Sequence, residues 1–173
     1  AYKYCKPGII NIPTNGILKS GPERVERILQ ACPDSQLIIN LSLDGVGEKH
    51  NFIRGVANNF EKFEERLEQY LELKKKYKNL AVGIHSVVST FNVHDLDELI
   101  EYAEQSAADQ FITEIAEPRV ELDTVGLPIT PNPEEYAAAV DKLIAYVESK
   151  QFKGISKITE AFRVEYYKLV KRI

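Results

Sequence analysis

Short apolar segments alternate with amphipathic segments four times along the chain, and this alternation constrains the fold more than any other feature. Each apolar segment has the composition of a strand, and each is followed by apolar positions at helical spacing. The four segments are GIINIPT at 8–14, QLIINLSL at 36–43, LAVGIHSVVST at 80–90 and QFITEIA at 110–116. This order predicts an α/β fold with a parallel sheet built from right-handed crossovers.

Polar residues mark where the intervening helices are expected to begin. Ser20 with Glu23, and Asn58 with Glu61, have the spacing of a capping box, Asn92 precedes the third helix, and Asn132-Pro133 opens the fourth. A last helix is expected from about Ser156, with Ile158, Phe162, Tyr166, Leu169, Val170 and Ile173 on one side. Residues 44–57 and 117–132 are expected to be loops, and a loop as long as the second is usually functional.

The length of 173 residues bears on the choice between a doubly wound sheet and a barrel. A complete barrel of eight strand–helix units takes about 250 residues. Four units would form part of a barrel, with two edge strands unpaired and an apolar concave face uncovered.

Charge and composition exclude several classes of protein. The net charge is −4, which is far from the basic balance of a nucleic-acid-binding domain. No apolar run approaches the ~18 residues of a membrane span, and the N-terminal residues lack the pattern of a signal peptide. Cys5 and Cys32 form no CxxC motif, so a cysteine-ligated metal site is not expected. A cytoplasmic protein without nucleic-acid or membrane partners is therefore expected.

Polar side chains gather where the expected strands end. They are Thr14-Asn15-Gly16, Ser42 and Asp44, Ser89 to Asn92, and Glu114 with Glu117 and Arg119. Because the carboxyl ends of parallel strands share one edge, these groups are expected to converge there, where ligands bind in such folds. Turn and cap chemistry explains each set equally well when it is taken alone. His85, in the middle of a strand, is expected to be packed rather than reactive, and the three histidines have no metal-binding spacing.

The most informative stretch is residues 42–55, SLDGVGEKHNFIRG, which follows a strand ending in Thr14-Asn15-Gly16. A strand ending TNG, then SLDG with a following H-x-x-x-R-G, resembles the middle of the barrel of radical S-adenosylmethionine (SAM) enzymes. The resemblance is closest to the branch with a cysteine-rich auxiliary-cluster domain, called SPASM or twitch, and extends from Ile9 to about the C-terminus. Asn51 stands where the family commonly has Asp, so no role is transferred to it.

The resemblance implies that the four strands are strands three to six of a six-stranded, partial TIM-like barrel in residues 1–150. Residues 151–173 would form a helix leading to the auxiliary-cluster domain. The family's CxxxCxxC loop is absent from this sequence. The remainder of the same polypeptide would therefore be the partner that supplies it, and the chain alone is expected to be inactive and to bind no [4Fe–4S] cluster.

By resemblance, the full enzyme would cleave SAM reductively at a [4Fe–4S] cluster and generate a 5′-deoxyadenosyl radical for peptide modification or cofactor biosynthesis. The substrate would be a peptide or a small molecule. Thr14, Asn15, Ser42, Asp44 and Arg54 would contact SAM, although a salt bridge from Arg54 to a neighbouring helix is an equal alternative. Asn92, Glu114, Glu117 and Arg119 would face the substrate, or form a solvated ion cluster. No catalytic residue is assigned.

Two other functions are compatible with the sequence. One is a self-contained α/β protein that binds a phosphorylated or nucleotide ligand, although neither GxGxxG nor GxxxxGK[ST] occurs. The other is a module without catalysis that pairs its open sheet edges with another chain.

Overall fold

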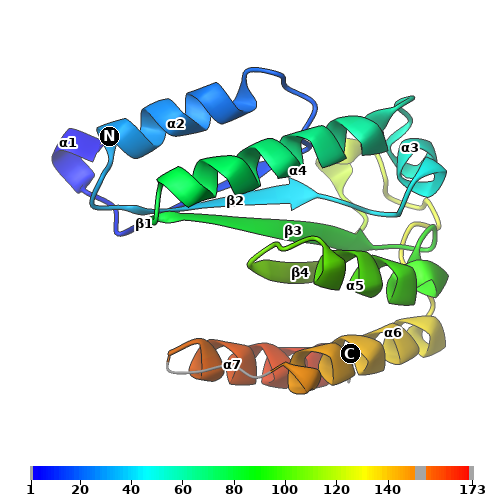
Figure 1. The fold of residues 1–173 in the computed structure, drawn as a ribbon. Coiled ribbons are helices and arrows are strands. Elements are labelled where there is room, and N and C mark those ends of the chain that lie inside the picture. Colours follow the sequence, from blue (N-terminus) through cyan, green and yellow to red (C-terminus); the bar gives the residue numbers. More distant parts are fainter. Residues whose placement is uncertain (1, 151–154, 172–173) are drawn as a thin grey trace. The chain divides into compact units, whose positions relative to one another are not determined.

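A computed structural model describes residues 2–150 and 155–171, which form four strands and a set of helices in the order shown in Figure 1. The strands are β1 Ile9–Thr14, β2 Gln36–Ser42, β3 Leu80–Val88 and β4 Gln110–Ile115. The α-helices are α1 Tyr2–Cys5, α2 Gly21–Ala31, α3 Glu48–Arg54, α4 Asn59–Lys76, α5 Leu96–Gln105, α6 Pro133–Ser149 and α7 Ile155–Val170. Two short 3₁₀ helices, η1 Val93–Asp95 and η2 Val120–Leu122, complete the list.

The strands form one parallel sheet in the order β1-β2-β3-β4, so the predicted α/β fold is confirmed. Ile9 pairs with Gln36 and Thr14 with Leu41 at the ends of the first pairing. Leu37 pairs with Leu80 and Ser42 with His85 in the second. Sequential strands are neighbours, joined by helices, which is the arrangement of part of a TIM-like (β/α) barrel.

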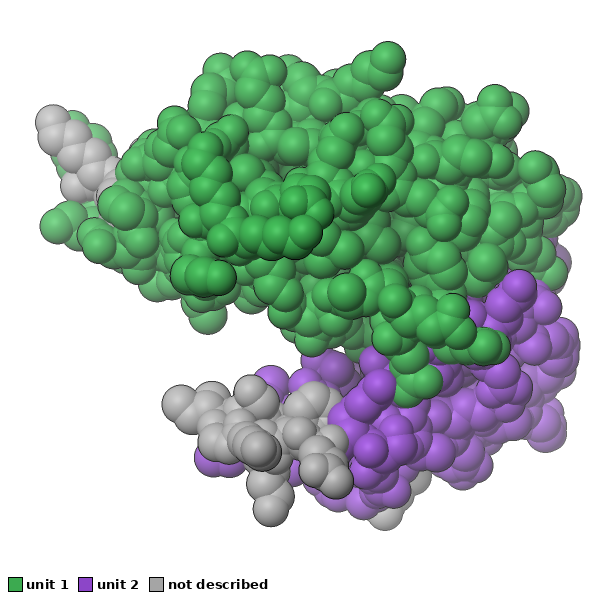
Figure 2. All heavy atoms as spheres, in the orientation of Figure 1, with its two compact units in different colours: residues 1–87, 101–114 green, residues 88–100, 115–173 purple. Residues whose placement is uncertain are grey.

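The described chain divides into two compact units, coloured separately in Figure 2: residues 1–87 with 101–114, and residues 88–100 with 115–173. In the first unit, α2 and α4 cover one face of the sheet (Figure 1). Alternate strand residues face these helices, and Leu37, Ile39, Leu41, Val82 and Ile84 are almost completely buried. Each such side chain contributes about 1.5–3 kcal/mol by burial, and together they fix which face of each strand turns toward the helices.

Helix α4 carries acidic residues near its start and basic residues at its end. Glu61 lies in its first turn, and Lys74, Lys75 and Lys76 lie in its last turn. This arrangement places opposite charges on the two ends of the helix dipole. Lys76 and Tyr77 both pair with Glu26 on α2, which fastens the two helices to each other.

Three of the predicted helix starts are wrong in detail. The side chains of Ser20, Asn58 and Asn92 make no capping hydrogen bond, and Asn58 has a left-handed backbone conformation. Asn132 does form the predicted cap, since its side chain accepts from the Glu135 amide while the Glu135 carboxylate accepts from the Asn132 amide. The segment 44–57 is not a simple loop, because it contains helix α3.

The second unit contains α6 and α7. Ala139, Val140, Leu143 and Val147 of α6 are buried, as are Val164 and Tyr167 of α7. The predicted apolar stripe of the last helix is not its buried face: Ile158, Phe162, Tyr166 and Leu169 are all more than half exposed. Ile173, also placed in that stripe, lies outside the described residues, as do 151–154 of the predicted C-terminal segment.

Candidate functional site

Asp44, two residues after β2, is the centre of a hydrogen-bonded cluster. Its Oδ1 accepts from the backbone N–H of Val87 on β3 at 2.9 Å, and its Oδ2 lies 2.7 Å from Nη2 of Arg54. Its own backbone N–H donates to Nδ1 of His50 at 3.1 Å. With the residue only 6% exposed, both carboxylate oxygens of Asp44 are engaged by the protein. The cluster ties the end of β2 to β3 and to α3.

The local sequence explains how this cluster forms. Gly45 lies so close to α3 that a Cβ would be 3.0 Å from the His50 amide, and Gly47 has a φ of +58°, so the tight turn before α3 requires glycine. Arg54 follows His50 by four positions, which places both on one face of α3. The H-x-x-x-R spacing therefore directs an imidazole and a guanidinium to the same carboxylate-bearing turn.

His50 is completely buried among Asp44, Phe60 and Phe63. Because its Nδ1 accepts from the Asp44 amide, the neutral ring carries its proton on Nε2, which has no partner among the described residues. Burial lowers the pKa of His50 to about 4, the positive charge of Arg54 lowers it as well, and Asp44 opposes both. The ring is therefore neutral near pH 7 and serves as a fixed acceptor.

Asn51 has a role that the sequence analysis did not assign. Its Oδ1 accepts from the backbone N–H of Phe60 at 2.8 Å, in the first turn of α4. The cap of α4 thus comes from α3 rather than from Asn58, and a contact between residues nine positions apart leaves no local signal in a sequence.

Thr14 and Asn15 shape the turn that follows β1. Thr14 Oγ1 accepts from the Gly16 amide, and Asn15 Oδ1 accepts from the Ile17 amide, both at 3.2 Å. Gly16 has a φ of +74° and packs against α4. Asn15 is exposed, whereas Thr14 and Ser42 are partly exposed. The structure thus gathers the five residues predicted to contact SAM in the first unit, at the carboxyl ends of β1 and β2 and on α3.

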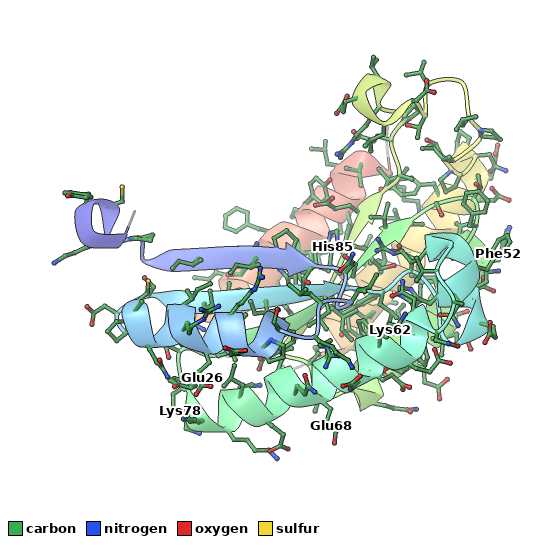
Figure 3. All side chains as sticks on the ribbon, turned by 90° about the horizontal axis from the view of Figure 1, so that it is seen from above. Glu26, Phe52, Lys62, Glu68, Lys78 and His85 are labelled. Atoms are coloured by element: carbon green, nitrogen blue, oxygen red, sulfur yellow. The ribbon has the colours of Figure 1, made fainter. Side chains whose placement is uncertain are left out.

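The side chain of His85 is only 22% exposed, so most of it is packed against its neighbours. It lies directly opposite Ser42 in the register of β2 and β3, and its Nε2 is 3.6 Å from Oε1 of Glu114 on β4. Figure 3 shows His85 toward the end of the sheet where α3 lies, with Phe52 on the outer side of that helix. Of the predicted substrate residues, Glu114 therefore lies in the first unit with Ser42.

The other predicted substrate residues lie in the second unit. Asn92 is 1% exposed, and its Oδ1 accepts from the Ser89 amide at 2.7 Å, which closes the turn after β3. Glu117 and Arg119 are exposed after β4. The following loop is fastened at its base, since Thr130 donates to the Ala116 carbonyl and Thr90 to the Pro128 carbonyl, both at 2.7 Å.

The described residues do not fit an iron–sulfur cluster. Such a cluster needs several converging thiolates, but Cys5 is exposed on α1 and Cys32 is buried after α2. In residues 2–150 and 155–171, no three His, Cys, Asp or Glu side chains are grouped so as to hold a metal ion. Within the same residues, no helix has the length and apolar character needed to cross a membrane.

These features define a class by fold: a parallel (β/α) sheet that forms part of a TIM-like barrel, with polar side chains at its carboxyl edge. No protein-family model matches the sequence, and no curated protein does. Solved structures do match, and those described next are of the protein anSMEcpe.

The hexahistidine-tagged enzyme with bound AdoMet gives a TM-score of 0.57 at 21% identity, over 79% of this chain and 35% of that chain. The native enzyme with AdoMet and the Kp18Cys peptide gives 0.58 at 21% identity, and with the Cp18Cys peptide 0.59 at 20%, each over 79% of this chain and 36% of that chain. This chain therefore spans about a third of the length of these structures. At this identity the similarity establishes the shared fold.

Proposed function

We propose that the chain is part of the barrel of a radical SAM enzyme and supplies walls that contact SAM and the substrate. The observation that carries this proposal is the match of 79% of the chain to structures with bound AdoMet. The cluster at the end of β2 supports it, because Ser42 and Asp44 belong to the SLDG motif on which the resemblance rests. In this proposal the strands correspond to strands three to six of the barrel.

The donor set at the carboxyl edge suits SAM. A hydroxyl at Ser42 and an amide at Asn15 are groups that hydrogen-bond to ribose hydroxyls or a carboxylate. Asp44 and Arg54 neutralise each other, so we assign them the task of holding Ser42 in place rather than that of binding SAM by charge. When bound, SAM together with a [4Fe–4S] cluster supplies radical chemistry. The described residues do not hold that cluster, and we propose that its thiolates belong to another part of the polypeptide.

Titration of the ¹⁵N-labelled chain with SAM, followed by amide NMR signals, tests the proposal, because this method detects binding even at millimolar affinity. We expect saturable shifts at Gly16, Ser42 and Leu43. Ser42→Ala should weaken binding about five- to tenfold through the loss of one hydrogen bond. Ser149→Ala, on α6 in the second unit, is the matched control and should leave binding unchanged. Absence of shifts at the three amides, or equal weakening by both variants, would contradict the proposal.

A further inference from the structure

Two of the side chains on the four strands are ionisable, and they face each other. β1, β2, β3 and β4 consist of apolar, amide and hydroxyl residues apart from His85 and Glu114, and they contain no lysine or arginine. His85 Nε2 and Glu114 Oε1 are 3.6 Å apart, within ion-pair distance. The pair lies next to Ser42, whose Cα is the register partner of His85.

The pair lies on the face of the sheet turned away from the helices of the first unit. The residues that alternate with the buried positions Leu41 and Ile84 belong to this face. Asn11, Asn40 and Gln110 form a row of amides across it, in which Asn40 donates to Asn11 and Gln110 donates to Asn40, both at 3.0 Å. Gly83 lets this row cross β3, since a Cβ there would be 2.2 Å from Oδ1 of Asn40.

The amides of the row hydrogen-bond to one another, whereas His85 and Glu114 do not. A separation of 3.6 Å is longer than a hydrogen bond, so neither group satisfies the other. Among the described residues, Glu114 is the one polar group that pairs with the His85 side chain. The side chains of His85 and Glu114 are 22% and 62% exposed, so both can be reached from solvent. The side chains of His85 and Glu114 can therefore form hydrogen bonds with a ligand bound on this face of the sheet.

We propose that Ser42, His85 and Glu114 form a binding row for a protonated amine on the substrate. Glu114 supplies negative charge, while a ring nitrogen of His85 and the hydroxyl of Ser42 offer hydrogen-bond acceptors, and together they match the three donors of an ammonium group. An anionic group would face the Glu114 carboxylate, with no lysine or arginine on the strands to offset it. Calling the amine part of the substrate rests on the proposed function, whereas the row itself rests on the geometry above.

The test uses the full chain and three small probes of similar length. N-acetyl-lysine amide carries the ammonium, N-acetyl-norleucine amide is its neutral counterpart, and N-acetyl-glutamate amide carries an anion. The readout is the shift of the imidazole NMR signals of His85. His94, which is exposed and 3.1 Å from Glu135 in the second unit, serves as an internal reference for unspecific binding to a histidine–glutamate pair.

We expect the lysine probe to shift the His85 signals saturably and to leave His94 unshifted. Glu114→Gln should weaken this binding at least fivefold. Glu68→Gln, which makes the same change of charge on the outer side of α4 (Figure 3), should not alter it.

Three results would overturn the proposal: equal shifts at His94 and His85, equal binding of the norleucine and lysine probes, or stronger binding of the glutamate probe. The probes contain no SAM, so the two proposals fail separately. Lysine-probe binding without SAM shifts at Gly16, Ser42 and Leu43 would refute the proposed function and leave the amine row standing. SAM shifts without lysine-probe binding would refute the amine row alone.

Discussion

Replacing Arg54 with alanine removes the positive charge that pairs with the buried carboxylate of Asp44. The side chain of Asp44 is 9% exposed and that of Arg54 is 29% exposed, with 2.7 Å between Oδ2 and Nη2. Removing one partner of a fully buried ion pair costs about 3–5 kcal/mol. Because the Arg54 guanidinium is partly in solvent, water reaches the carboxylate in the variant and lowers this cost. We expect a loss of about 2–3 kcal/mol in the free energy of unfolding.

Urea unfolding at pH 7, followed by circular dichroism, measures this loss. The midpoint should fall while the m-value stays constant, because the folded and unfolded surfaces change little. For a chain of this size the loss corresponds to a fall of roughly 4–12 °C in the melting temperature. Lys75→Ala is the matched control: Lys75 pairs with Glu72 on the surface of α4, and its loss should cost under about 1 kcal/mol.

A double-mutant cycle decides whether the loss arises from the contact with Asp44. Asp44→Ala alone, Arg54→Ala alone and the double variant should give a coupling energy of about 1–3 kcal/mol. Two results refute the reasoning. Losses that simply add would show that Arg54 acts elsewhere, and an Arg54→Ala loss no larger than that of Lys75→Ala would show that the carboxylate needs no countercharge.

Three further predictions concern stability. Gly83→Ala should destabilise the chain by roughly 1–3 kcal/mol, because its Cβ would lie 2.2 Å from Asn40 Oδ1, whereas Gly8→Ala, with open space around it, should change the urea midpoint little. His50 has a folded pKa of about 4, below its unfolded value near 6.5, so the unfolded chain binds the proton first. The free energy of unfolding, measured from pH 7 down to pH 4.5, should therefore decrease once the pH is below about 6.5, and it should decrease less steeply in His50→Gln. Equal slopes for the two proteins would contradict this role of His50. Asn132→Ala should lower the free energy of unfolding by about 1 kcal/mol, because it removes the cap of α6. Ser20→Ala removes no capping hydrogen bond and should lower it by only about a few tenths of a kcal/mol. Equal losses of the two variants in thermal melts would contradict the assignment of Asn132 as the cap.

Local patterns in the sequence were sufficient to predict the strands and most of the helices. The apolar alternation located all four strands, and the order of strands and helices predicted the parallel sheet. Capping boxes were less reliable. Asn132 caps α6 as its spacing indicates. Asn58 has the same spacing but a left-handed backbone and no capping hydrogen bond, and Asn51 accepts from the Phe60 amide of α4 instead. A competing donor or acceptor from another element cannot be read from spacing within one helix.

In the candidate site, too, the sequence predicted the local motif but not the contacts between elements. The sequence indicated that Asp44 and Arg54 belong to one motif, and it left open whether Arg54 would bind a ligand or form a salt bridge. The partner that the structure provides is Asp44 itself, since α3 turns Arg54 back onto the strand end. The existence of α3 was missed because its seven residues are too few to show a clear apolar period.

The inclusion of His85 in the row with Ser42 and Glu114 was not predictable, because it depends on strand register. A shift of one residue would turn every side chain of a strand to the opposite face. In this sheet the register is held by the complete burial of Leu41 and Ile84 against the helices, and by the fit of Gly83 opposite Asn40. A shifted β3 would move Ile84 out of the core and bring His85 into it, where the imidazole would lose contact with water. The same packing that stabilises the sheet therefore presents His85 beside Ser42, and core substitutions that alter the register should abolish the row together with the fold.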